Sequence, residues 1–182
     1  MIPAGYLAKK IEKRPDWLEA PAVHDIYSVS GCVSEEFCDY VPHWKHNGYW
    51  LFNSPADIYA IAAEDSIDMT DQKSFYYEVY EKQFDDKRKI WESYDSEPDF
   101  RTKVKEPSSK RLEGFDVVTF FARTSPECSP LSCNCLAAEI PVNTHCLLPS
   151  LEEAIRLVET GAFEHGEPGP LRIFAVYTLD AA

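Results

Sequence analysis

The sequence has no long hydrophobic run and no leader-like beginning. No apolar stretch approaches the ~20 residues that are needed to cross a bilayer. Residues 1–10 lack a basic segment followed by an apolar one, which is the pattern of a secretory signal. We therefore expect a soluble cytoplasmic protein with no membrane partner.

Basic residues are scarce relative to acidic ones. The chain has 18 Lys and Arg against 31 Asp and Glu, which gives a formal net charge of −13. Because such a surface repels phosphate backbones, we expect no nucleic-acid partner. The same charge favours solubility and attracts cationic partners.

The common catalytic signatures are also missing. The chain has no glycine-rich phosphate loop, no G-x-S-x-G elbow, no H-E-x-x-H helix and no EF-hand loop. We recognise no internal repeat and no long low-complexity stretch. Neither an enzyme class nor a repeat architecture is indicated.

The remaining composition is that of a globular protein. The 182 residues are 45% hydrophobic and 27% charged, which suits a single domain over 1–182 with a core of its own. A helix is predicted from Ser54, the N-cap, to about Glu64. A second is predicted over 151–160, with a capping box from Ser150 and with Gly161 after its end.

Strands are predicted from apolar and β-branched runs. We expect two central strands, two shorter ones and a hairpin, over 115–122, 171–179, 23–30, 48–52 and 75–94. The helix at 151–160 is expected to join the two central strands as parallel neighbours. The charged stretch 95–113 is expected to be an exposed loop. The order of elements indicates an α+β fold, with a mixed or mainly antiparallel sheet packed against two or three helices.

Four cysteines and a histidine are concentrated between positions 128 and 146. Cys128, Cys133, Cys135 and Cys146, with His145, are candidate zinc ligands, since zinc takes four S or N ligands. Their spacings match no common zinc module. Free cysteines are also typical buried residues, and packing is the interpretation that we favour, with no cofactor. Zinc is the alternative.

A catalytic thiol is a further interpretation of the same segment. Ser132 is predicted to cap a short helix over 133–139, which would place Cys133 in its first turn, near the positive end of the helix dipole. Cys128 is the other candidate nucleophile, and His145 or His24 would act as the base.

A second candidate region is aromatic. Asn47 and Gly48 form a turn signal, and aromatic residues flank them. Trp44, His46 and Tyr49 are candidate binding residues, because Trp and Tyr are enriched at interfaces.

The sequence does not establish the function. The hypothesis that we favour is a small non-catalytic binding protein, of the immunity or antitoxin type, that recognises a basic protein or a small molecule. The alternative is a thiol- or zinc-dependent enzyme centred on residues 128–146. The oligomeric state stays open.

Overall fold

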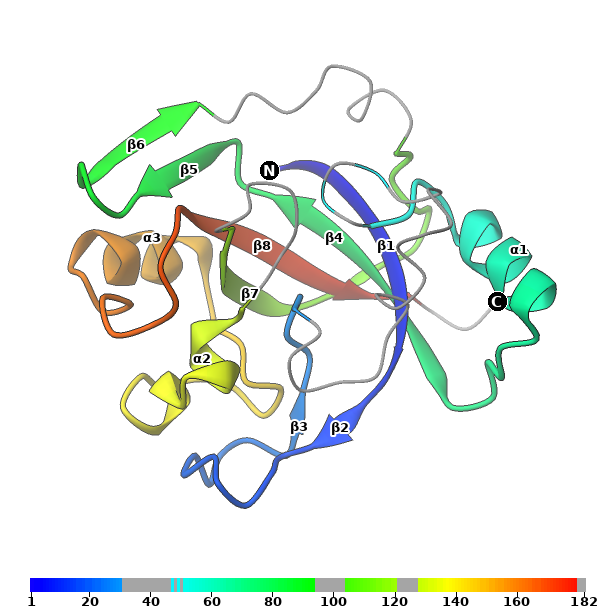
Figure 1. Cartoon of the computed structure of the whole chain (residues 1–182), viewed down its shortest axis with the longest axis horizontal. Coiled ribbons are helices and arrows are strands. Elements are labelled where there is room, and N and C mark those ends of the chain that lie inside the picture. Colours follow the sequence, from blue (N-terminus) through cyan, green and yellow to red (C-terminus); the bar gives the residue numbers. More distant parts are fainter. Residues whose placement is uncertain (31–46, 48, 50, 94–103, 121–127, 180–182) are drawn as a thin grey trace.

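The computed structural model describes residues 1–30, 47, 49, 51–93, 104–120 and 128–179. It forms one body with an α+β fold, as predicted (Figure 1). No helix in the described part of the chain is long and apolar enough to span a membrane.

The order of elements along the chain differs from the prediction mainly at the N-terminus. The strands are β1 (Ile2–Lys10), β2 (Glu12–Lys13), β3 (Asp25–Ile26), β4 (Gln72–Val79), β5 (Lys82–Asp85), β6 (Ile90–Ser93), β7 (Arg111–Thr119) and β8 (Leu171–Thr178). The helices are α1 (Pro55–Asp65), α2 (Pro130–Cys133), the 3-10 turn η2 (Leu136–Ala138) and α3 (Leu151–Glu159).

The sheet has six strands, and every described pair in it is antiparallel. The strands follow the order β1-β4-β8-β5-β6, and β7 pairs with the other edge of β8. Strands β2 and β3 form a separate two-stranded sheet. In Figure 1, β4 and β8 run through the middle, with α1 and α3 on opposite sides of the picture.

Both predicted helices are confirmed, and their caps explain their limits. The Ser54 side chain accepts a hydrogen bond from the Asp57 N–H, and Ser150 accepts one from the Glu153 N–H. Helix α3 ends at Glu159, and Gly161, the residue after the C-cap, has φ +78, a left-handed conformation that glycine adopts without a Cβ penalty.

Several strand predictions need correction. The helix at 151–160 does not join parallel strands, because β7 and β8 are antiparallel neighbours. Strand β1 was not predicted, and only residues 25–26 of the predicted strand 23–30 pair as one. The hairpin is confirmed for β5 and β6, but β4 is a separate central strand. The predicted loop ends earlier than residue 113, since β7 begins at Arg111.

The chain contains an internal duplication that was not recognised in the sequence. Each of the edge strands β1 and β7 has a bulge next to a glycine with positive φ, Gly5 at +144 and Gly114 at +151. Over each glycine lies an asparagine side chain. Asn47 Nδ2 donates to the carbonyl before Gly5, and Asn143 Nδ2 donates to the carbonyl before Gly114, both at 2.7 Å.

We name the segments that begin at Asn47 and Asn143 the clamps. Their other hydrogen bonds agree as well. Asn47 Oδ1 accepts from the backbone N–H groups two and four residues on, and Asn143 Oδ1 does the same. The backbone N–H of each asparagine donates to the carbonyl four residues on. Each clamp then pairs with its edge strand and leads into a serine-capped helix, α1 or α3.

The duplication extends to the central strands. Gly5 lies opposite Tyr77 of β4, and Gly114 lies opposite Val176 of β8, so Tyr77 and Val176 are equivalent. These two residues also face each other across the β4–β8 pair. A local two-fold axis therefore passes between them and relates β1, α1 and β4 to β7, α3 and β8. Each half becomes an internal control for the other.

Candidate functional site

Each half buries a charged side chain at a position where the other half has an apolar residue. Asp116 is fully buried, two residues after Gly114. The equivalent residue, two after Gly5, is Leu7. Lys9 is fully buried, and its equivalent is Val118. Burying an ion costs several kcal/mol unless it is paired or hydrogen-bonded. Because the other half has apolar residues at these positions, each charge depends on polar contacts that its apolar equivalent does not make.

Asp116 connects three parts of the chain. Its Oδ2 accepts hydrogen bonds from the Val29 N–H at 2.8 Å and from Ser129 Oγ at 2.6 Å. Its Oδ1 has no hydrogen-bond partner within the described residues. Burial raises the pKa of Asp116 to about 7, although these two hydrogen bonds and the charge of Lys9 oppose the shift.

Lys9 lies on the same face of the interior. Its Nζ donates a hydrogen bond to the Ser28 carbonyl and stands 5.3 Å from the centre of the Phe75 ring. The carbonyl and the ring face both stabilise the ammonium. Lys9 and Asp116 thus tie the segment around residues 28–30 to β1 and β7, and we name this group the buried charged cluster.

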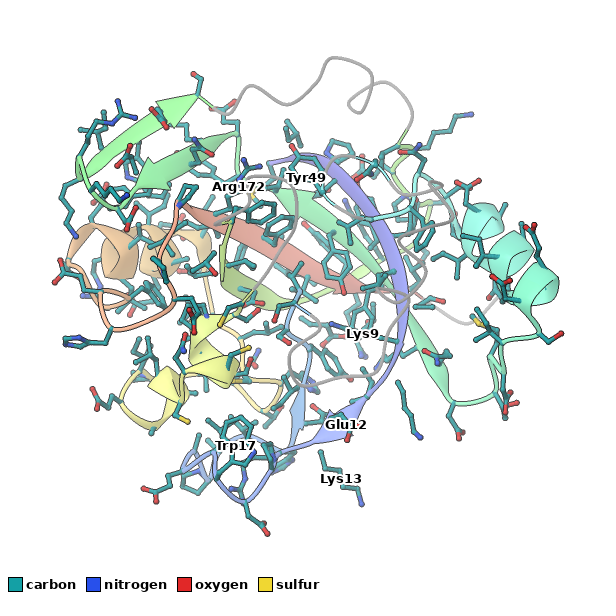
Figure 2. The ribbon with its side chains drawn as sticks, viewed as in Figure 1. Lys9, Glu12, Lys13, Trp17, Tyr49 and Arg172 are labelled. Atoms are coloured by element: carbon teal, nitrogen blue, oxygen red, sulfur yellow. The ribbon has the colours of Figure 1, made fainter. Side chains whose placement is uncertain are left out.

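A second buried cation comes from β8. Arg172 donates to Gln83 Oε1 at 3.0 Å, and its guanidinium lies 4.4 Å from the Phe120 ring centre and 5.8 Å from that of Tyr49. Figure 2 shows Arg172 and Tyr49 close together, away from Lys9. The equivalent of Arg172 is Lys73, so both halves keep a cation here.

The cysteine segment lies beside the buried charged cluster, and its four thiols differ in exposure. Cys128 and Cys146 are buried, and Cys133 and Cys135 are half-buried. Cys128 Sγ contacts Asn134 Oδ1 at 3.3 Å, and Cys133 Sγ lies 3.6 Å from Ser30 Oγ. No three His, Cys, Asp or Glu residues of the described chain are grouped so as to hold a metal ion. The zinc hypothesis stays a prediction without a ligand set.

The predicted position of Cys133 is wrong. Helix α2 begins at Pro130 after the N-cap Ser129, three residues earlier than expected, because proline suits the first helical position. Cys133 is therefore the last residue of α2 and not part of a first turn. The dipole argument for a reactive Cys133 does not apply, and a four-residue helix has little dipole in any case.

His145 faces carboxylates and a phenol ring. Its Nδ1 pairs with Asp25, its Nε2 lies 3.8 Å from Glu113 Oε2, and its ring stacks on Tyr27 with the centres 4.0 Å apart. These contacts place its two ring nitrogens toward acids and not toward a thiol, so they favour a structural role for His145 over that of a general base. His145 is the clamp equivalent of Tyr49, which packs edge-on against Phe174.

Comparison with family models, with curated proteins and with solved structures found no match. Function must therefore be argued from the residues of this chain.

Of the three predicted binding residues, the structure describes only Tyr49. Tyr49 is buried, so it belongs to the interior and not to an exposed surface. Trp44 and His46 lie outside the described residues. Lys9, Asp116 and Arg172 were not predicted as site residues, although the last two interrupt the apolar runs 115–122 and 171–179. A charge within such a run is the sequence signal that could have identified them.

The four described thiols should differ strongly in alkylation rate. Burial, with the nearby charges of Asp116 and Cys133, raises the pKa of Cys146 to about 12, so little reactive thiolate forms at neutral pH. We expect Cys146 to react on the order of a hundredfold more slowly than Cys135. Iodoacetamide labelling with peptide mapping measures this, and labelling in urea is the control. Equal rates in the folded protein would contradict the arrangement.

Proposed function

We propose that the protein is a non-catalytic binding protein that recognises a basic protein partner through the exposed face of α1. The observation that carries this proposal is a difference between the two equivalent helices. Helix α1 exposes a stripe made of Ala56, Tyr59, Ala60 and Ala63. The Tyr59 side chain is 56% exposed.

Helix α3 carries charges at the matching exposed positions. Glu152, Arg156 and Glu159 are the equivalents of Ala56, Ala60 and Ala63. Arg156 also forms a bidentate pair with Glu153, in which two N–H groups donate to the two carboxylate oxygens. At three of the four positions the apolar outer face is therefore specific to α1, whereas the equivalent of Tyr59 is Ile155, which is half-buried. An exposed tyrosine is the kind of residue that is enriched at the centre of protein interfaces.

The charge around the α1 stripe indicates the sign of the partner. The span 54–72 has five acidic residues and no Lys or Arg. The acids after the stripe, Glu64, Asp65, Asp68 and Asp71, are all exposed. An apolar stripe that is followed by exposed acids is complementary to a partner with basic residues beside an apolar contact, and the net charge of −13 would speed the encounter.

The test is a pair of substitutions that change the net charge equally on the two helices. Ala60→Arg gives α1 the residue that α3 carries, and Glu152→Gln adds the same +1 on α3. Wild-type and variant proteins, immobilised, are used to capture partners from lysate at low and high salt, with identification by mass spectrometry. We expect a basic partner that is lost at high salt, bound at least about tenfold more weakly by Ala60→Arg, and unaffected by Glu152→Gln.

Three outcomes would count against the proposal. They are the absence of any basic partner, binding that does not depend on salt, and equal effects of the two substitutions.

A further inference from the structure

Three tyrosines from neighbouring strands form a row on one face of the sheet. Tyr6 of β1 lies directly opposite Tyr76 of β4, which lies opposite Tyr177 of β8. Directly opposed residues in antiparallel strands point to the same face. The ring centres are 5.0 Å apart for the first pair and 5.7 Å for the second. We name this row the tyrosine cage.

The tyrosine cage already holds an ammonium group, that of Lys110. The Nζ atom lies 5.0 Å from the centre of the Tyr76 ring and 4.5 Å from that of Tyr177. It donates to Glu78 Oε1 at 2.5 Å and also pairs with Glu106. Aromatic faces with a charge-assisted acceptor are the usual means of binding an organic cation.

The Glu78 carboxylate is held in position by one of the cage tyrosines. Tyr177 donates its hydroxyl hydrogen to Glu78 Oε2 at 2.9 Å, which leaves Oε1 for the cation. The Tyr76 ring is fully buried, and its hydroxyl has no hydrogen-bond partner within the described residues. Burial and the neighbouring carboxylate raise the pKa of Tyr177 to about 12 and that of Tyr76 further, so both stay neutral phenols.

The duplication shows that the fold does not require tyrosine at two of the three cage positions. The equivalents of Tyr6 and Tyr76 are Phe115 and Ala175, which belong to an ordinary apolar core in the other half. The third tyrosine, Tyr177, comes from the other half, where it is the equivalent of Glu78. The cage therefore joins two tyrosines of one half to a tyrosine of the other.

The geometry points to the tyrosine cage as a binding site for a primary ammonium group, the lysine side chain of a basic protein, with Lys110 as its internal substitute. The inference rests on the proposed function for the identity of the partner. Lys110 ends the segment 104–110, which has no regular secondary structure and exposes Lys105 and Glu106. The cage lies on three paired strands. Val104 of this segment is buried and the Tyr6 hydroxyl donates to the Lys105 carbonyl, so exchange of the cation would displace these contacts while the paired strands stay in place.

The acceptors select the type of cation. Glu78 and Glu106 both take N–H hydrogens from Lys110, and a quaternary ammonium has none to give. The rings alone attract either type. A primary ammonium ion should therefore bind more tightly than a quaternary one, and this difference separates a lysine side chain from a choline-like headgroup.

The experiment empties the cage and offers it a small cation. Lys110→Ala removes the internal occupant, and n-butylammonium, which mimics a lysine side chain, is titrated in while the tyrosine ring signals are followed by NMR. We expect saturable binding with a Kd on the order of 10 mM, as suits a ligand of five heavy atoms. Tetramethylammonium should bind about tenfold more weakly.

Two controls keep the cage filled. Lys105→Ala removes a neighbouring exposed lysine, and Lys110→Met retains the aliphatic stem within the cage. Neither of these proteins nor the wild type should show saturable n-butylammonium binding. A folded Lys110→Ala protein without saturable binding, or one that binds no better than the wild type, would overturn the inference. If Lys110→Ala is unfolded, n-butylammonium should restore the fold, and absence of that rescue would also overturn it.

The titration needs no protein partner, so it separates the two proposals. Failure of n-butylammonium binding alongside salt-dependent capture of a basic partner refutes the cage and leaves the binding function. Success of the titration without any captured partner supports the cage and refutes the binding function.

Discussion

Gly114→Ala should destabilise the protein by about 2–6 kcal/mol, enough to unfold much of it. A Cβ on Gly114 would lie 2.7 Å from Leu147 Cβ and 2.8 Å from the Leu148 carbonyl oxygen. Its φ of +151 adds backbone strain for any residue with a side chain. Both neighbouring atoms belong to the clamp, so neither can rotate away.

The duplication provides a second measurement and a control. Gly5→Ala should cost about the same, because its Cβ would meet Leu51 Cβ at 2.7 Å and the Phe52 carbonyl oxygen at 2.8 Å. Gly161→Ala is the control. Its Cβ would meet only the flexible Glu164 side chain, so the left-handed φ of +78 alone sets the loss, which we expect to be about 1 kcal/mol. Urea unfolding monitored by circular dichroism measures all three. A small effect of Gly114→Ala would contradict the clamp geometry.

The stability of the protein should fall as the pH rises from about 4 to 7, through the titration of Asp116. Its pKa is raised to about 7 in the folded protein, against about 3.9 in an unfolded chain. Between these values the folded state keeps a proton that the unfolded state has released, so stability decreases with rising pH. The contribution is complete below about pH 3.9 and is lost at pH 7, and it amounts to about 4 kcal/mol.

Asp116→Asn isolates this contribution from that of all other groups. Asparagine keeps an acceptor for the Val29 N–H and Ser129 hydroxyl but does not titrate. We expect the free energy of unfolding of the wild type, relative to that of the variant, to decrease between pH 5 and pH 8. Urea unfolding at both values measures it. A difference between the two proteins that is the same at both pH values would show that Asp116 does not titrate in this window.

The duplication is hard to recognise in the sequence because few of its residues are the same in both halves. The shared pattern is an asparagine, then Leu-Phe or Leu-Leu four residues on, then the serine cap, as in Asn47 to Ser54 and Asn143 to Ser150. The spacing between equivalent residues is 109 at the glycines, 96 at the clamps and 99 at the central strands. Loops of unequal length hide the alignment, and buried positions require only apolar residues of suitable volume.

Packing and side-chain pairing account for several residues of the cysteine segment. Two of its thiols are buried, and its histidine is paired with Asp25. The features that packing does not explain are the charged residues beside it, Lys9 and Asp116, together with the tyrosine cage. Lys9, Asp116, Tyr6 and Tyr76 stand where the other half has apolar residues, Val118, Leu7, Phe115 and Ala175.

The sequence by itself determined the two long helices, their caps, the central strand β8 and the α+β class. These depend on local chemistry, namely a serine oxygen that reaches an N–H three residues on, a glycine that accepts a left-handed φ, and apolar periodicity. The acidic balance is likewise a property of composition. Tertiary structure alone decided the antiparallel pairing of β7 with β8, the strand β1 and the two clamps. It also brought Lys110 to Tyr76 and Tyr177, and Asp116 to Val29. Such contacts join residues far apart in the chain, and no local pattern encodes which partner each will meet.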